Sequence, residues 1–198
     1  TFKKEKVFCF GIYGSDSDQS KIVEILYYKN DNEFLISLTP KDHAHKIILL
    51  KTNEKFKSMA KILSKIDNYI NLGNYEIRTR KAEWKYTFNE GDNVIIPKIK
   101  FNIKTNYQTL EGKTFYSNQQ SYLIKEAMQR TAFTLDEYGA QIESESGIIA
   151  LSAKEKEEER PQPKHLIFDK PFFIMLKKTH SKNPYFAMWV VNSELMIK

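Results

Sequence analysis

Two histidines, His43 and His45, stand two positions apart beside Asp42, and all three side chains are of types that bind zinc. In an extended segment, residues two positions apart point to the same side, so both imidazoles could contact one ion. No cysteine lies nearby, and the whole chain has only four His and one Cys. We therefore interpret this segment as a surface turn, and we predict no metal site and no cofactor.

The sequence also lacks the short motifs that support nucleophilic or phosphate chemistry. It has no Gly-rich phosphate loop, no Gly-x-Ser-x-Gly turn and no His-Glu-x-x-His helix. Ser15, Ser17 and Ser20 fall in a polar segment that is typical of a loop, and no carboxylate next to His165 or His180 suggests an oriented imidazole. We predict no catalytic residues, and therefore a protein that is not an enzyme.

Basic residues do not form a recognisable nucleic-acid surface. The chain has 31 Lys plus Arg against 25 Asp plus Glu, a net charge of +6. The densest charged run, Lys154 to Arg160, mixes three positive with four negative charges. Nucleic-acid-binding proteins usually gather their basic residues on one face, so we predict no nucleic-acid partner. No apolar run approaches the roughly 20 residues of a membrane helix, which predicts no membrane span.

Aromatic and basic side chains alternate in residues 77–88, which include Arg80, Lys81, Trp84, Lys85 and Tyr86. This alternation predicts a strand with one buried aromatic face, and a binding face for a partner is the alternative. A second strand is predicted over residues 94–104, with residues 89–92 as the turn between the two. Pro97 within that second run indicates an edge strand or a bulge.

Elsewhere the pattern predicts strands and one long helix. Residues 22–29 and 33–39 are predicted to form a hairpin. Residues 46–51 are predicted to form either a strand or the segment that precedes a helix. Apolar residues recur at three- and four-residue spacing from Glu54 to Leu72. That spacing predicts a helix capped by Thr52 or Asn53, with Gly73 just past its end.

The C-terminal third combines a polar segment with two apolar strands. Residues 122–135 are ambiguous in their first half and alternate in their second half. Residues 140–163 are rich in Ser, Glu and Lys and are predicted to form an exposed loop. Strands over 166–176 and 185–191 follow, joined by a turn over 177–183. The 198 residues therefore predict a single α+β domain over residues 1–198, mainly antiparallel sheet with few helices.

The run from Leu166 to Leu176 resembles the C-terminal signature of the serpin family. It agrees at each constrained position, and its core consists of Phe168, Asp169, Lys170, Pro171 and Phe172. Residues 185–192 resemble the family's final buried strand, and residues 124–140 resemble the central-sheet strand that leads into its reactive loop. Weaker similarity covers residues 96–101 and 23–38. The resemblance spans most of this chain but only the C-terminal half of a serpin, so a missing N-terminal half is a further expected partner.

The resemblance implies that residues 140–163 form the protease-accessible reactive loop. Its hinge would be Glu137, Gly139 and Ala140. Counting back from Pro171 by the family's usual spacing gives Arg160 as the bait residue, and counting forward from Glu137 gives Ala153 as the alternative. Inhibitory serpins trap a protease when the cleaved loop inserts as a new strand into the central sheet. Insertion requires a strand on each side of the gap, and the sequence supplies one such strand, residues 123–136.

The loop also departs from the inhibitory pattern. Inhibitors carry mostly short residues after the hinge glycine, whereas Gly139 is followed by Ala140-Gln141-Ile142-Glu143-Ser144-Glu145. A carboxylate that reached the core side of a sheet would cost several kcal/mol, so insertion is disfavoured. Met188 stands where the family usually has glycine, which indicates a locally repacked core.

Three hypotheses follow from these observations. The leading one is a serpin-like protein that is non-inhibitory or is the C-terminal portion of a larger serpin. The second is an inhibitor of trypsin-like serine proteases with Arg160 as bait, and the third is a binding or scaffold domain that uses its aromatic strands. A serine protease or another protein is the expected partner, and a secreted or periplasmic location is favoured only by the family's protease-facing members.

Overall fold

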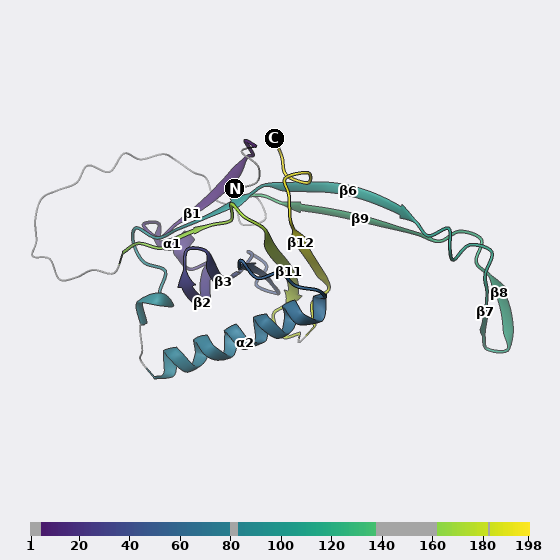
Figure 1. The fold of residues 1–198 in the computed structure, drawn as a ribbon, viewed down its shortest axis with the longest axis horizontal. Coiled ribbons are helices and arrows are strands. Elements are labelled where there is room, and N and C mark those ends of the chain that lie inside the picture. Colours follow the sequence, from purple (N-terminus) through teal and green to yellow (C-terminus); the bar gives the residue numbers. More distant parts are fainter. Residues whose placement is uncertain (1–4, 80–82, 138–161, 182) are drawn as a thin grey trace, which may run out of the picture.

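The computed structural model describes residues 5–79, 83–137, 162–181 and 183–198 (Figure 1). Its elements follow in the order β1 (Cys9–Tyr13), α1 (Ser17–Ser20), β2 (Val23–Asn30), β3 (Glu33–Leu38), β4 (His45–Lys51), α2 (Met59–Arg78), a 3-10 turn η1 (Glu83–Lys85), β5 (Asn93–Pro97), β6 (Ile99–Asn106), β7 (Thr114–Ser117), β8 (Gln120–Leu123), β9 (Met128–Leu135), β10 (His165–Ile167), β11 (Phe172–Lys178) and β12 (Phe186–Val190). The predicted α+β class, dominated by antiparallel sheet, is confirmed. None of the described helices is long and apolar enough to cross a membrane.

A five-stranded antiparallel sheet, in the order β12-β11-β4-β3-β2, forms the centre of the body. Its strands are apolar on both faces because both faces are covered. One face, with Leu35, Leu50 and Phe173, packs against α2. The other, with Ile36 and Leu49, packs against a second sheet in the order β1-β5-β10. Each fully buried large apolar side chain contributes about 1.5–3 kcal/mol, which makes this three-layer core the main source of stability.

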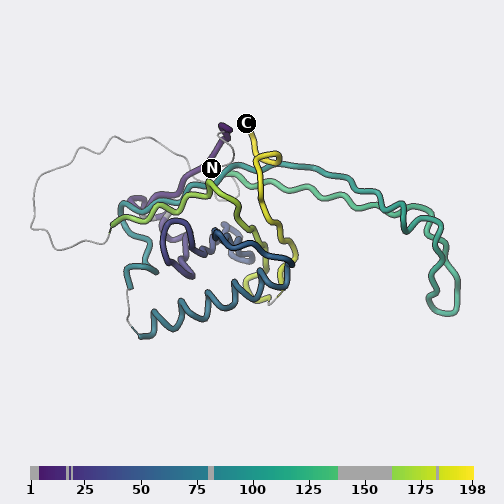
Figure 2. The backbone as a smooth tube through the Cα atoms, viewed as in Figure 1, coloured from purple at the N-terminus to yellow at the C-terminus, as the bar shows by residue number. Residues whose placement is uncertain are grey.

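A long two-stranded ribbon, formed by β6 and β9, leaves the body and ends in the β7–β8 hairpin (Figure 2). Ile99 and Leu135 at the body end are buried, whereas Ile103 further out is 45% exposed. Isolated two-stranded sheets are marginally stable in water. The ribbon therefore gains little stabilisation from burial in the core.

The predicted hairpin over 22–29 and 33–39 is confirmed, and residues 46–51 form a strand. The predicted helix has the wrong limits, since it begins at Met59 rather than Glu54 and continues to Arg78. The Thr52 hydroxyl accepts a hydrogen bond from the Glu54 amide, and this local turn replaces the expected cap.

Gly73 lies inside the helix and does not end it. A Cβ at this position would lie 2.1 Å from the Leu26 carbonyl oxygen of β2. The glycine therefore permits close packing of α2 on the sheet, at some cost in helix propensity.

The predicted strand over 77–88 is wrong, because these residues contain the end of α2 and η1. Lys85 and Tyr86 both donate hydrogen bonds to Glu76 of α2, so their side chains return to the helix. The predicted strand over 94–104 is two strands, because the chain changes sheets at Lys98. Pro97 is not on an edge strand; it ends the central strand β5, beyond the last pair with β10.

Of the remaining C-terminal predictions, the strand over 185–191 is confirmed as β12, and the single strand over 166–176 is wrong. Residues 122–135 contain the end of β8 and all of β9, without a helix. The run over 166–176 is divided into β10 and β11, which lie in different sheets. Most of the predicted loop over 140–163 lies outside the described residues.

Candidate functional site

The candidate site consists of the residues that hold the two ends of segment 138–161. This segment includes Gly139, Ala140, Ala153 and Arg160, all of which lie outside the described residues. The flanking residues are described, and both are bound next to β5. Glu137, before the segment, is bound to Lys98, which follows β5. Lys164, after the segment, is bound to Asp92, which precedes β5.

Glu137, the predicted hinge residue, is bound to Lys98, which directly follows β5. The Lys98 ammonium donates a short hydrogen bond to Glu137 Oε1, and this bond lowers the pKa of the Glu137 carboxyl. The two side chains remain 21% and 26% exposed. An ion pair this close to solvent contributes at most about 1 kcal/mol. The first anchor is therefore weak.

The second anchor joins Lys164, directly before β10, to Asp92, directly before β5. Lys164 Nζ lies 2.7 Å from Asp92 Oδ2, and both side chains are only 2% exposed. The Lys164 amide donates to Asp92 Oδ1 at 2.7 Å, and the Asn89 amide donates to Oδ2 at 2.8 Å. Lys164 Nζ also donates to the Trp84 carbonyl at 2.9 Å and lies over the Trp84 ring. Because both charges are buried and hydrogen-bonded, loss of either partner is expected to be costly.

The predicted signature residues connect β10 to β11. Lys51 Nζ, at the end of β4, donates to Asp169 Oδ1 at 2.8 Å and to the Ile167 carbonyl at 2.6 Å. Burial opposes ionisation of Asp169, but the hydrogen bond and charge of Lys51 outweigh it and lower the Asp169 pKa. Phe168 packs on the rings of Phe34 and Phe172.

The other signature residues have related positions. Lys170 donates to the Asn32 side chain at 2.7 Å, in the β2–β3 turn. Pro171 lies between Lys170 and β11. The contacts of the signature are therefore structural, since they fix the turn after β10 against the central sheet.

The ribbon places one strand beside the start of the segment. β9 ends two residues before Glu137 and pairs with β6 along one edge; among the described residues, no strand pairs with its other edge. The register puts Phe101 opposite Phe133 on one face and Lys104 opposite Arg130 on the other. The ribbon is thus amphipathic, with an apolar face that continues outward from the core.

Of the other sequence candidates, Trp84 lies at the second anchor, whereas the Asp42–His45 segment and the serines do not contact either anchor. His45 Nδ1 lies 2.6 Å from Asp42 Oδ2, but nowhere in the described ranges do three or more His, Cys, Asp or Glu gather in a group that could hold a metal. Trp84 lies in η1 beside Lys164. Ser15, Ser17 and Ser20 lie at and around the short α1.

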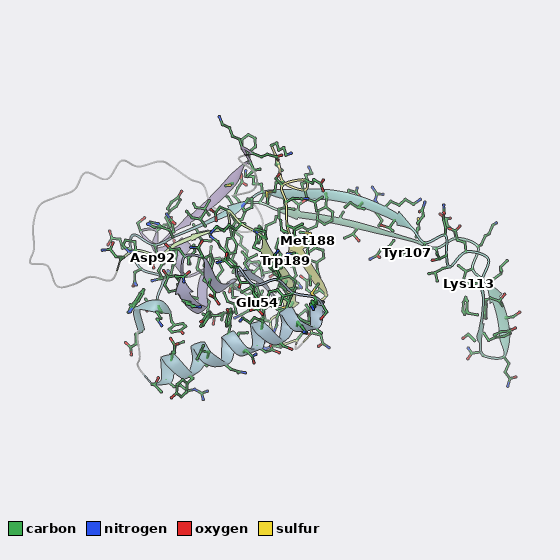
Figure 3. All side chains as sticks on the ribbon, in the orientation of Figure 1. Glu54, Asp92, Tyr107, Lys113, Met188 and Trp189 are labelled. Carbon is green, nitrogen blue, oxygen red and sulfur yellow. The ribbon has the colours of Figure 1, made fainter. Side chains whose placement is uncertain are left out.

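Met188 lies in β12, opposite Ile174, and packs half-buried against the core (Figure 3). Sequence reasoning missed Asp92, Lys98 and Lys164, because nothing in the local pattern distinguishes them from surface charges. In Figure 3, Asp92 lies in the body, whereas Lys113 lies where the β7–β8 hairpin begins, beyond the outer end of the ribbon.

A family model for the serpins, described as serine protease inhibitors, matches residues 2–193. The chain belongs to the serpin family. Serpins are generally protease inhibitors rather than enzymes. Among curated proteins, no sequence matches this serpin chain.

Solved serpin structures are similar in fold. SRPN18 from Anopheles gambiae has a TM-score of 0.50 at 11% identity, and the match covers 95% of this chain and 47% of SRPN18. Serpin48 from the insect Tenebrio molitor, described as a highly specific serpin, has a TM-score of 0.43 at 16% identity, with 93% and 45% covered. The chain thus spans about half the length of the solved serpins that it matches.

Proposed function

We propose that this chain is a serpin-like protein that does not trap proteases by itself, and that it is either a non-inhibitory homologue or the C-terminal portion of a larger serpin. The observation that carries this proposal is the ribbon: β9 has a paired strand on one edge, and no described strand borders its other edge. The proposed reactive loop follows β9 directly.

A loop that inserted beside β9 would gain hydrogen bonds along one side only. Each backbone hydrogen bond contributes about 0.5–1.5 kcal/mol net, so a strand with one neighbour gains about half of what a strand between two neighbours gains. The other edge of the inserted strand would need water or a further strand. The smaller gain in hydrogen bonds supports the proposal that proteases cleave this chain, by itself, as a substrate.

The exposed apolar side chains of the ribbon support the larger-serpin form of the proposal. Ile103 is 45% exposed and lies on the same face as Phe101 and Phe133, and this apolar face is continuous with the core. A further sheet and its covering layer would bury these residues. In this form, the N-terminal half of a serpin is the partner of the ribbon.

The test is incubation with trypsin, followed by a denaturing gel and a thermal melt. We expect cleavage within residues 138–161, no band heavier than either protein, full remaining trypsin activity and no rise in melting temperature. An adduct that survives denaturant would refute the proposal.

The inhibitor hypothesis makes the opposite predictions for the same gel. If Arg160 is the bait, Arg160→Ala abolishes the adduct with trypsin, while the control Lys154→Ala leaves it intact. Ala153, the alternative bait, suits proteases with a small specificity pocket and is tested in the same way with an elastase-type enzyme.

A further inference from the structure

The β7–β8 hairpin lies at the outer end of the ribbon, away from the body (Figure 1). Every residue of its two strands is exposed. Four of the side chains are large aromatic or aliphatic groups that are 42–80% exposed, namely Phe115, Tyr116, Tyr122 and Leu123. The rings of Phe115 and Tyr122 stack with their centroids 5.3 Å apart, and the Tyr122 hydroxyl donates to the Gln120 side chain at 2.8 Å. A cluster of exposed large side chains on an isolated hairpin is typical of a surface that a partner covers.

The turn and the base of the hairpin fix its shape. Asn118 and Gln119 form the two-residue turn, and their φ angles of 49° and 64° give it the left-handed backbone of a tight hairpin turn. At the base, the Ile124 amide donates to the Lys113 carbonyl at 2.9 Å. These two ends determine which residues of β7 and β8 lie opposite each other.

The outer edge of β8 carries backbone groups that no described strand binds. In an antiparallel pair, hydrogen-bonded and non-hydrogen-bonded residue pairs alternate. The pair at the base of the hairpin is bonded, so the pair of Phe115 with Tyr122, two positions further on, is also bonded. The amides and carbonyls of Ser121 and Leu123 therefore point outward from β8.

The outer edge of β8 is also uncharged. Proteins usually prevent the pairing of an exposed edge strand with charged residues or proline along it. The run from Asn118 to Ile124, which contains β8, has neither, whereas Lys113 directly precedes β7. The edge of β8 is therefore the edge of the hairpin that is open to another strand.

We propose that this chain forms a homodimer in which the β8 edges of two copies pair antiparallel about a two-fold axis. The two hairpins then form one four-stranded sheet. Tyr122 lies at the axis, opposite Tyr122 of the second copy. Ser121 lies opposite Leu123 of the second copy, and the outward amides and carbonyls of both residues bind each other.

A second copy is the occupant because the edge of β8 is complementary to itself. On one face, the two Tyr122 rings extend the stack with Phe115 into a row of four aromatic side chains. On the other face, the small Ser121 lies beside the large Leu123. Gln120 lies opposite Ile124, so no charged residue faces another, although the chain as a whole has a net charge of +6.

The dimer is expected to be weak and to keep the two bodies apart. The paired run from Gln120 to Ile124 is about 17 Å long. A contact of this length buries less than the roughly 1,200 Å² of a stable interface, so we expect a dissociation constant above about 1 µM. The ribbon separates each body from the axis, because its strands β6 and β9 have eight residues each.

The test is sedimentation velocity of the whole chain at concentrations from about 1 µM to 1 mM, with matched proline variants. Ser121→Pro removes one outward amide from each copy and should weaken the dimer about tenfold or more. The control Thr114→Pro makes the same change on the outer edge of β7 and should leave the dimer unchanged. Neither amide takes part in the pairing of β7 with β8, so both variants should keep the melting temperature of the unmodified chain.

A charge exchange at the axis tests the register. Tyr122→Lys and Tyr122→Glu should each be monomeric alone, because each places two like charges directly opposite one another. An equimolar mixture of the two variants should form a dimer again, because Lys then lies opposite Glu. Recovery in the mixture would also show that neither variant lost the hairpin.

Several outcomes would overturn the proposal. These are a chain that stays monomeric at every concentration, a dimer that both proline variants weaken equally, or a mixture of the two charge variants that stays monomeric. A monomer that cosediments with phosphatidylserine vesicles, and loses this binding in Leu123→Ser, would identify a lipid surface as the partner of the hairpin instead.

Discussion

Replacing Asp92 with Asn tests the buried anchor after the segment, because it removes one charge and little volume. The Lys164 side chain is 2% exposed and keeps only the Trp84 carbonyl and ring as described polar contacts. An uncompensated buried charge costs about 3–5 kcal/mol. Since domains of this kind are stable by about 5–15 kcal/mol, this loss from Asp92→Asn is at least about a fifth of the total.

Equilibrium denaturation in urea measures this loss, with tryptophan fluorescence as the signal. Trp84 is a direct reporter because its ring lies 5.6 Å from Lys164 Nζ. The double variant Asp92→Asn with Lys164→Met removes both charges, and it should recover most of the stability that the single variant lost. The reasoning is wrong if Asp92→Asn costs less than about 1 kcal/mol, or if the double variant is no more stable than the single one.

Two further changes test the packing of α2 and the ion pair of Glu137 with Lys98. Gly73→Ala should destabilise the protein by more than about 1 kcal/mol in a thermal melt, because its Cβ would meet the Leu26 carbonyl. The control Asn74→Ala, at the exposed neighbouring position, should be neutral or stabilising. Equal effects of the two variants would show that the close contact is unimportant. Glu137→Gln should cost at most about 1 kcal/mol, and the full cost should appear only above the ordinary Glu pKa of about 4.5. The folded-state pKa of Glu137 is lowered, so its ion pair with Lys98 stabilises the protein at neutral pH and is lost as the pH falls through that folded value. A stability difference between Glu137→Gln and the unmodified chain that was as large at pH 3 as at pH 7 would contradict this assignment.

The amino-acid sequence by itself determined the local elements and the family. Alternating β-branched and aromatic residues on both sides of Asn30-Asp31-Asn32 predict the β2–β3 hairpin, because a two-residue period and a turn are properties of neighbouring residues. The α+β class follows from the order of such elements. The signature from Phe168 to Phe172 is contiguous, so it could be recognised without knowing what it contacts.

The tertiary structure alone decided which charges form the site. Lys98 and Glu137 are 39 residues apart, and Asp92 and Lys164 are 72 apart, so no periodicity links either pair. Their pairing depends on β5 being the central strand between β1 and β10. The limits of α2 also depended on the tertiary structure. Gly73 lies inside the helix because β2 passes too close to it for a side chain, and the local pattern does not contain that contact. Short-range patterns predict which residues are buried. Which residues they contact depends on how distant segments of the chain pack together.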